Sequence, residues 1–262
     1  MDKRFTFNED AMNYEKWRPT YCEELFHDIM EYSKLDRNYS SLGEASLYSE
    51  IGIGTGQATL PFLKTGCDLI AIELGENLAE FSKNKFKDYK NFSILNVPFE
   101  DFKCDENTFD LIYSATAFHW IDENIGYPKA FKLLKPGGTL ALFWNKPFIG
   151  RKDDLLHQKI QSIYEKYKPS KAKPIENDEE HYKELLKKLR KYGFKDVELK
   201  LYNKTRIFNA CDYISLLNTY SDHRSMNLAI KTKFEEEIKK AILEHNNLLK
   251  VYDTMELYLA RK

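Results

Sequence analysis

The chain has 262 residues, of which 42% are hydrophobic and 31% charged, with only 11 glycines and 8 prolines. This composition excludes a disordered or collagen-like chain, and the length allows a large core in one domain, alone or with a smaller annex. The formal net charge of −1 argues against nucleic acid as an obligatory partner, because phosphate binding requires a broad positive field.

The N-terminal sequence MDKRFTFNEDAMNYEKW is charged and lacks the apolar centre of a signal peptide. No stretch approaches the roughly 18 apolar residues of a membrane span. The four cysteines are widely separated and form no CxxC or Cys/His pair at zinc spacing. These features predict a cytoplasmic protein with reduced thiols, without a membrane partner and without a bound metal.

Short apolar runs alternate with helical segments between residues 47 and 144. Strands are expected at 47–51, 69–73, 92–96, 109–115 and 139–144. Helices are expected at 56–65, 77–86 and 124–135, the last closed by Pro136, Gly137 and Gly138. Strands that are apolar throughout and separated by helices indicate a parallel sheet with right-handed crossovers.

The pattern changes after residue 150. Residues 151–205 carry 15 Lys and Arg against 10 Asp and Glu, with apolar residues at helical spacing up to about residue 192. Residues 194–208 and 251–260 alternate as strands do, with one or two helices between them. We therefore predict a doubly wound, mostly parallel seven-stranded α/β sheet, with a helical insertion placed to cover its carboxyl edge. Ligands of such sheets bind outside the carboxyl ends of the strands, where the strand order reverses.

Three glycines, Gly52, Gly54 and Gly56, follow the first expected strand within five positions. A glycine turn between a strand and a helix offers backbone N–H groups to a ligand and permits its close approach. The P-loop pattern is absent, because no Lys-Ser/Thr pair follows the last glycine. The dinucleotide pattern GxGxxG is also absent, since Gln57 stands where its third glycine would be. What remains is an acidic residue followed by GxGxG, from Glu50 through Gly56.

The stretch EIGIGTGQAT resembles motif I of the class I S-adenosylmethionine (SAM)-dependent methyltransferases, which reads Asp/Glu-x-Gly-x-Gly-x-Gly. In that family the turn passes close to the amino acid and ribose parts of SAM. The resemblance implies cofactor binding by Glu50, Gly52, Gly54, Gly56 and Gln57. A glycine turn that serves only to reverse the chain is the alternative.

Two later segments are similar to the same family in order and spacing. Glu73 and Leu74 end the second strand, where a carboxylate in nucleotide-binding folds accepts two hydrogen bonds from a ribose diol. The alternative for Glu73 is an acid favoured by the following helix N-terminus. The segment NVPFEDF resembles the segment that borders adenine, which implies contacts from Phe99 and Glu100. Pro98 departs from that pattern, which often has Asp there.

The sequence FDLIYSATAFHWID resembles the methyltransferase type 11 group, including its trans-aconitate methyltransferase-like branch with the signature AxAFHW. The resemblance implies that Ser114 and Ala115 lie beneath the methionine part of the cofactor. His119 and Trp120 would then face the active-site cavity. The next segment, 131–143, matches the helix, turn and strand that follow in the family.

The two ends of the chain extend the resemblance. NYEKWRPTY is similar to the Tyr-x-x-x-Arg-Pro segment that precedes the core, which implies that Tyr14 and Arg18 close over the cofactor. Arg18 would then offer bidentate donors to the methionine carboxylate. The alternative is a helix packed onto the sheet with Arg18 in solvent. A second similar segment, 213–226, would contribute to the acceptor site the residues Tyr220, Ser221, His223 and Arg224.

Methyl transfer from a sulfonium is an in-line displacement, so the protein must hold donor and acceptor collinear and exclude water. A carboxylate or thiolate acceptor needs no general base, whereas a phenol or a carbon acid gains from one. His119 is the candidate base, and a structural or acceptor-positioning histidine is the alternative. An acidic acceptor would need cations such as Arg18, Arg206 and Arg224.

The Asn/Asp-Pro-Pro-Tyr/Phe motif of amino-methylating nucleic-acid enzymes does not follow the fourth strand, and no Cys follows a Pro as in cytosine-C5 enzymes. We therefore predict a SAM-dependent methyltransferase, monomeric or homodimeric, that acts on a small molecule and releases S-adenosylhomocysteine. A protein methyltransferase or a non-catalytic SAM-binding protein is the alternative. The predicted parts are an N-terminal lid (1–40), the SAM-binding core (41–148), a helical insertion (149–192), and strands and helices that complete the sheet and the acceptor pocket (193–262).

Overall fold

The computed structural model describes residues 11–34, 45–170 and 175–262. The described chain forms two compact units, which we treat separately. The sheet unit contains the described residues of 19–144, 179–202 and 256–262. The helical unit contains those of 1–18, 145–178 and 203–255. The predicted lid, 1–40, lies partly outside the described residues, and the predicted division into four parts stays a prediction.

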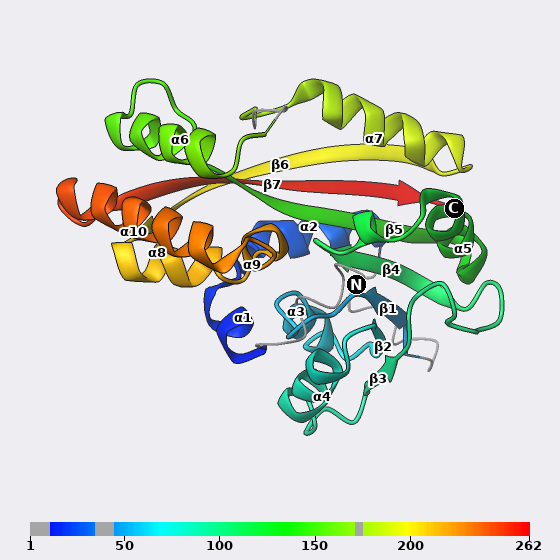
Figure 1. Cartoon of the computed structure of the whole chain (residues 1–262). Coiled ribbons are helices and arrows are strands. Elements are labelled where there is room, and N and C mark those ends of the chain that lie inside the picture. The colour runs from blue at the N-terminus through cyan, green and yellow to red at the C-terminus, as the bar shows by residue number, and fades with distance from the viewer. Residues whose placement is uncertain (1–10, 35–44, 171–174) are drawn as a thin grey trace. The chain divides into compact units, whose positions relative to one another are not determined.

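Seven strands form one sheet in the order β3-β2-β1-β4-β5-β7-β6 (Figure 1). Their bounds are β1 Leu47–Ile51, β2 Asp68–Glu73, β3 Phe92–Asn96, β4 Phe109–Ala115, β5 Leu134–Phe148, β6 Lys195–Phe208 and β7 Leu249–Arg261. Strands β1 to β5 pair in parallel, and the order reverses between β1 and β4. The carboxyl ends of β1 and β4 are therefore the switch point at which such sheets bind ligands.

The last strand, β7, runs against β5. Within the sheet unit, Gly137 donates its N–H to the Lys262 carbonyl and Lys262 donates to the Gly138 carbonyl. Within the helical unit, Asn145 contacts Asp253. Residue numbers therefore rise along β5 as they fall along β7, which is the mark of antiparallel strands. The predicted mostly parallel seven-stranded sheet is confirmed.

One predicted boundary is wrong. Helix α5 (Glu123–Leu133) ends before the Pro-Gly-Gly sequence, which lies inside β5 and does not close the helix. Lys135, the residue before Pro136, disfavours the helical conformation, and Leu134 before it is already extended and completely buried. The strand thus starts five residues before its expected position at Thr139.

The helices follow local signals in the sequence. Their bounds are α1 Ala11–Trp17, α2 Glu23–Ser33, α3 Thr59–Leu63, α4 Glu76–Lys85, α6 Leu155–Tyr167, α7 Glu179–Lys191, α8 Ala210–Leu217, α9 Ser221–Arg224 and α10 Leu228–Glu244. Four helices have Asp or Asn caps that accept a hydrogen bond from a backbone N–H of the first turn: Asp122, Asp154, Asn209 and Asn227.

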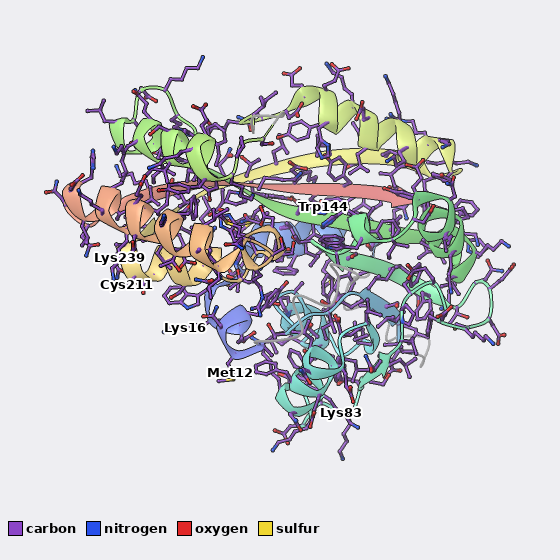
Figure 2. All side chains as sticks on the ribbon, in the orientation of Figure 1. Met12, Lys16, Lys83, Trp144, Cys211 and Lys239 are labelled. Atoms are coloured by element: carbon purple, nitrogen blue, oxygen red, sulfur yellow. The ribbon has the colours of Figure 1, made fainter. Side chains whose placement is uncertain are left out.

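Each unit has its own apolar core. In the sheet unit, side chains such as Phe109, Ile112 and Leu140 are fully buried. In the helical unit, Ile160 and Phe234 are fully buried. Charged and polar positions on the helices turn outward, as Figure 2 shows for Lys83 on α4 and Lys239 on α10. The two cores give each set of functional residues a rigid support.

Candidate functional site

The glycine turn follows β1 and requires glycine for two reasons. Gly52, Gly54 and Gly56 have φ angles of +71°, +59° and +80°, in the left-handed region that favours glycine. In addition, a Cβ atom on Gly52 would overlap the Cβ atom of Ala117, in the segment that follows β4. The turn is therefore packed directly against the AxAFHW segment.

The carboxylate of Glu73 ties the glycine turn to the end of β2. It accepts hydrogen bonds from the Gly54 N–H and the Gly75 N–H, both at 2.8 Å and one on each oxygen. Burial raises the pKa of Glu73, and these backbone hydrogen bonds oppose that rise. The Leu74 N–H is a third backbone donor to this carboxylate. Since a carboxylate has about four lone-pair sites, one site remains for a ligand hydroxyl.

The loop after Glu73 is held from β3. The amide of Asn96 donates to the carbonyls of Glu73 and Leu74, at 2.9 and 3.0 Å. The sequence analysis did not identify Asn96, although it lies directly opposite Glu73 in the parallel register of β2 and β3. A polar residue at the end of a neighbouring strand was the available signal.

Glu50 lies in the interior of the sheet unit. It is 1% exposed, and its Oε2 accepts hydrogen bonds from the Thr59 and Tyr113 hydroxyls, at 2.7 and 2.8 Å. Burial raises its pKa to about 7, against the opposing effect of these two hydrogen bonds. These contacts join β1 to α3 and β4, so any contribution of Glu50 to cofactor binding is made through the position of the turn.

Helix α4 secures the carbonyl side of the glycine turn. The Ser82 hydroxyl donates to the Gly54 carbonyl at 2.8 Å, and the Lys85 ammonium donates to the Thr55 carbonyl at 2.9 Å. Gln57, predicted to bind the cofactor, donates its amide to the Thr55 hydroxyl. Sequence reasoning missed Ser82 and Lys85, although their spacing of three puts them on one helix face.

The end of β4 carries a strained residue. Ser114 is fully buried and donates to the Ile51 carbonyl at 2.8 Å, while Ala115 is half-buried. The next residue, Thr116, has a φ of +55°, although it is β-branched. Such a conformation costs roughly 1–3 kcal/mol and persists only where the surroundings impose it. Here the Thr116 hydroxyl is hydrogen-bonded to the Tyr21 hydroxyl at 2.7 Å, a contact that the sequence analysis did not foresee.

His119 lies on a short 3₁₀ helix (Phe118–Trp120) and is exposed, whereas its neighbour Trp120 is half-buried. The Trp144 indole N–H donates to Nδ1 of His119 at 3.0 Å. Because an indole nitrogen can only donate, Nδ1 of His119 must be the acceptor, and the neutral ring carries its proton on Nε2. His119 therefore offers an N–H donor at Nε2. To act as a base there, it would first have to move its proton to Nδ1 and lose the Trp144 hydrogen bond.

We expect this tautomer to be visible in ¹⁵N NMR spectra of histidine-labelled protein. His119 should be protonated on Nε2, and Trp144→Phe should let both tautomers appear while costing about 0.5–1.5 kcal/mol of stability. His245 is the internal reference, because its Nδ1 lies 2.8 Å from the Ala241 carbonyl and must therefore be the donor. A wild-type His119 protonated on Nδ1 would contradict the assignment.

Part of the segment predicted to border adenine is packed in the apolar core. Phe99 is 4% exposed and belongs to the core of the sheet unit. The ammonium of Lys129 lies 5.2 Å from its ring centre and donates to the Glu100 carbonyl at 2.9 Å. Contacts to a ligand base from this segment would therefore come from its backbone or from the Glu100 side chain.

Tyr14 and Arg18 belong to the helical unit, and their predicted role above the cofactor stays a prediction. There the Arg18 guanidinium lies between two aromatic rings, 4.9 Å from the Tyr14 ring centre and 4.6 Å from that of Tyr220. It also donates to the Thr219 carbonyl at 3.0 Å. This cation thus stabilises the turn between α8 and α9.

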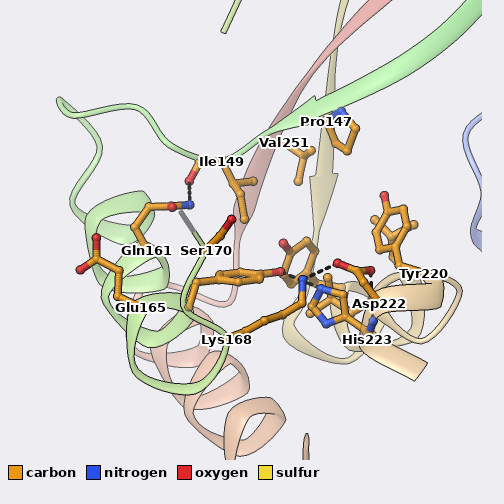
Figure 3. A pocket seen from close by; sticks show the side chains of 14 residues that line it. Pro147, Ile149, Gln161, Glu165, Lys168, Ser170, Tyr220, Asp222, His223 and Val251 are labelled. Carbon is orange, nitrogen blue, oxygen red and sulfur yellow. Dashed lines mark hydrogen bonds and ion pairs between the residues drawn. The ribbon is translucent and has the colours of Figure 1, made fainter. Parts of the chain in front are cut away.

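A cavity of about 360 Å³ lies within the helical unit (Figure 3). Tyr220 and His223, two of the residues predicted to bind the acceptor, line it, and Arg224 is not among the lining residues. Trp120, also predicted to bind the acceptor, belongs to the sheet unit. The other lining residues are Pro147, Ile149, Gln161, Tyr164, Glu165, Lys168, Ser170, Tyr213, Leu216, Leu217, Asp222 and Val251.

Comparison with known proteins gives a family match over the sheet unit. Residues 49–142 match the model of the Methyltransf_11 family, described as a methyltransferase domain. The chain is 24% identical to an uncharacterized methyltransferase of Schizosaccharomyces pombe, over 90% of this chain and 87% of that protein. Alignments to relatives from Mycobacterium tuberculosis and Saccharomyces cerevisiae cover only 54% and 45% of those proteins.

Solved structures show the fold. A type II methyltransferase structure from Anaeromyxobacter dehalogenans superposes with a TM-score of 0.60 at 16% identity, over 93% of this chain and 97% of that chain. A phosphoethanolamine N-methyltransferase of Haemonchus contortus, solved with phosphomonomethylethanolamine and S-adenosylhomocysteine, gives a TM-score of 0.55 at 13% identity. That match covers the whole of this chain and 60% of the Haemonchus chain.

Among the described residues, no helix is long and apolar enough to cross a membrane.

Proposed function

We propose that the chain is a SAM-dependent methyltransferase that methylates a small-molecule acceptor, because residues 49–142 match a methyltransferase domain and the relatives it resembles are methyltransferases. The observation that carries the proposal is the glycine turn, held in left-handed conformations at the switch point and joined to Glu73 through the Gly54 N–H. The trans-aconitate branch remains a prediction.

The residues present fit SAM. The glycines let the turn adopt left-handed conformations beside the end of β4, and Glu73 keeps acceptor capacity for a ribose hydroxyl. We propose that Ser114 and Ala115 support the methionine part and that Phe99 and Glu100 border the adenine. When bound, SAM supplies a sulfonium methyl group to a nucleophile held in line with it.

His119 contributes to the reaction, in this proposal, by orienting the acceptor. Its Nε2–H can donate to a lone pair of the acceptor, and the Trp144 hydrogen bond fixes the ring for that purpose. A carboxylate acceptor suits this arrangement, because it has lone pairs both for the Nε2–H of His119 and for the methyl carbon, and it does not require His119 to remove a proton.

The positive charge of residues 151–205 does not favour a protein substrate. Several of its lysines are already in ion pairs within their own unit. These pairs are Lys166 with Glu237, Lys168 with Asp222, and Lys188 and Lys191 with Glu123. An acidic protein would meet a surface whose charge is partly neutralised.

The proposal is tested by ligand-induced thermal stabilisation. At about 100 times their dissociation constants, SAM and S-adenosylhomocysteine should stabilise the protein by roughly 2.7 kcal/mol, or about 5–10 °C, whereas NAD and ATP should not. Glu73→Gln should weaken SAM binding by about 10- to 100-fold, since it removes the charge that a ribose hydroxyl would meet.

The matched control is Glu76→Gln, an exposed carboxylate on the first turn of α4. It should bind SAM as the wild type does. Stabilisation by NAD in place of SAM would overturn the proposal, and so would equal SAM affinities in the Glu73→Gln and Glu76→Gln variants.

A further inference from the structure

Tyr21 lies just before helix α2 and is held within the sheet unit by aromatic packing. Its ring is edge-on to that of Phe143, with the two ring centres 4.7 Å apart, and edge-on to that of Phe26, with the centres 6.4 Å apart. Phe143 is completely buried on β5, and Phe26 is 7% exposed. Because both neighbours belong to the packed interior, the Tyr21 hydroxyl has a defined position.

That hydroxyl is hydrogen-bonded to the hydroxyl of Thr116 at 2.7 Å. Thr116 directly follows β4 and has a φ of +55°, a conformation that is rare for a β-branched residue. The backbone N–H of Thr116 also donates to the Phe143 carbonyl at 2.8 Å. One hydrogen bond to the side chain and one to the backbone therefore hold Thr116 in a conformation that its own preference opposes.

The conformation of Thr116 determines where the next residues lie. Ala117 packs directly on the glycine turn, because its Cβ atom lies 2.4 Å from the position of a Cβ atom on Gly52. The 3₁₀ helix that carries His119 begins immediately after Ala117. If Thr116 relaxed to a negative φ, the chain would leave β4 in another direction. Ala117 would then move away from the turn, and His119 would lose its hydrogen bond from Trp144.

We propose that Tyr21 is a positioning residue for SAM binding. Its hydroxyl holds Thr116 in the left-handed conformation, and Thr116 in turn holds Ala117 against the glycine turn. The fraction of molecules in this arrangement sets the apparent affinity for SAM, so Tyr21 needs no contact with SAM for this role. The inference rests on the proposed function, because it assigns a residue that supports the SAM site.

Removal of either hydroxyl tests the role of the hydrogen bond. Tyr21→Phe keeps the ring, and isothermal titration calorimetry should give a SAM dissociation constant about fivefold larger than that of the wild type. Thr116→Ala should weaken binding to a similar extent, and Thr116→Ser, which keeps the hydroxyl, should recover most of the affinity that Thr116→Ala loses. The matched control is Tyr32→Phe, which removes a hydroxyl that donates to the Asp196 carbonyl in the same unit and should leave the affinity unchanged.

A glycine at position 116 tests the role of the backbone conformation. Thr116→Gly lacks the hydroxyl, as Thr116→Ala does, but glycine adopts a positive φ without strain. Thr116→Gly should therefore bind SAM more tightly than Thr116→Ala, and adding Tyr21→Phe to it should have no further effect. Weaker binding by Thr116→Gly than by Thr116→Ala would overturn the inference. So would a fivefold loss on adding Tyr21→Phe to Thr116→Gly.

The indole N–H of Trp144 reports the position of the segment in the absence of SAM. It donates to Nδ1 of His119 at 3.0 Å, and Trp144→Phe identifies its signal among those of the three tryptophans in a ¹H–¹⁵N spectrum. Tyr21→Phe and Thr116→Ala should shift or broaden this signal, whereas Tyr32→Phe should not. An unchanged Trp144 signal in Tyr21→Phe would overturn the inference, even where the SAM affinity falls.

SAM binding by the wild type separates this inference from the proposed function. If the wild type does not bind SAM, the proposed function fails and the inference fails with it. If the wild type binds SAM and Tyr21→Phe binds it equally well, only the role of Tyr21 is wrong. Thermal unfolding checks that each variant is folded. Should Tyr21→Phe not fold, the comparison of Thr116→Ala with Thr116→Ser decides, and equal SAM affinities of these two would overturn the inference.

Discussion

Gly52→Ala should be among the most damaging single substitutions in this protein, with a loss of about 2–5 kcal/mol in the free energy of unfolding. The new Cβ atom has to occupy a φ of +71° and overlaps the Cβ atom of Ala117. For a chain of this size the loss corresponds to a melting temperature about 5–15 °C lower. Calorimetry measures it, and SAM binding should fall with it because the turn must move away from Ala117.

Two further variants separate the collision from the backbone strain. Gly66 has a φ of +85° and no atom within 4 Å of the position of its missing Cβ, so Gly66→Ala should cost only about 1–2 kcal/mol. Ala117→Gly in the Gly52→Ala background removes the overlapping atom and should restore part of the stability. Equal losses of unfolding free energy for Gly52→Ala and Gly66→Ala would show that the overlap with Ala117 contributes nothing to the loss.

The second large effect concerns Glu50 and pH. Its pKa is about 7 in the folded protein and 4.5 as an ordinary value, so the folded state binds more protons between these two pH values. The contribution of Glu50 to the free energy of unfolding should therefore be greatest below pH 4.5. It should fall as the pH rises to about 7, by about 3 kcal/mol at most. Above pH 7 the contribution is constant.

Urea unfolding between pH 4.5 and 8 measures this dependence. Glu50→Gln keeps an oxygen for Thr59 and Tyr113 and cannot ionise, so its stability should fall much less over the same range. A remaining slope of the same sign is expected from Glu73, whose pKa is also raised by burial. The exposed Glu76→Gln is the control and should follow the wild type. Parallel curves for the wild type and Glu50→Gln would contradict the assignment of the proton to Glu50.

The sheet could be predicted because its central strands are buried on both faces. Such strands read as short apolar runs, and those expected at 47–51 and 109–115 coincide with β1 and β4. The edge strand β3, also expected at its observed bounds of 92–96, is more exposed. The start of β5 could not be found in the same way, because Pro136 and the two glycines after it are turn residues in most contexts. Only the pairing with β7 makes a strand of them.

The contacts that define the site depend on residues far apart in the sequence. Trp144 contacts His119, from which it is separated by 25 positions in the sequence, and Tyr21 contacts Thr116, from which it is separated by 95. No periodicity encodes such pairs, so the tautomer of His119 could not be deduced from the sequence. The cavity likewise combines lining residues from near 149, 164, 216 and 251, which only the fold brings together.

The ring of Phe86 occupies the volume beside the glycine turn that a side chain on Gly56 would need. The two positions therefore share one fixed volume, although 30 residues separate them. A larger residue could replace Gly56 without a collision only after a smaller residue had replaced Phe86. Even then, the left-handed φ of position 56 would strain the backbone of the new residue. Phe86, which directly follows α4, therefore restricts position 56 to glycine, because each single substitution on the way to another pair of residues would destabilise the fold.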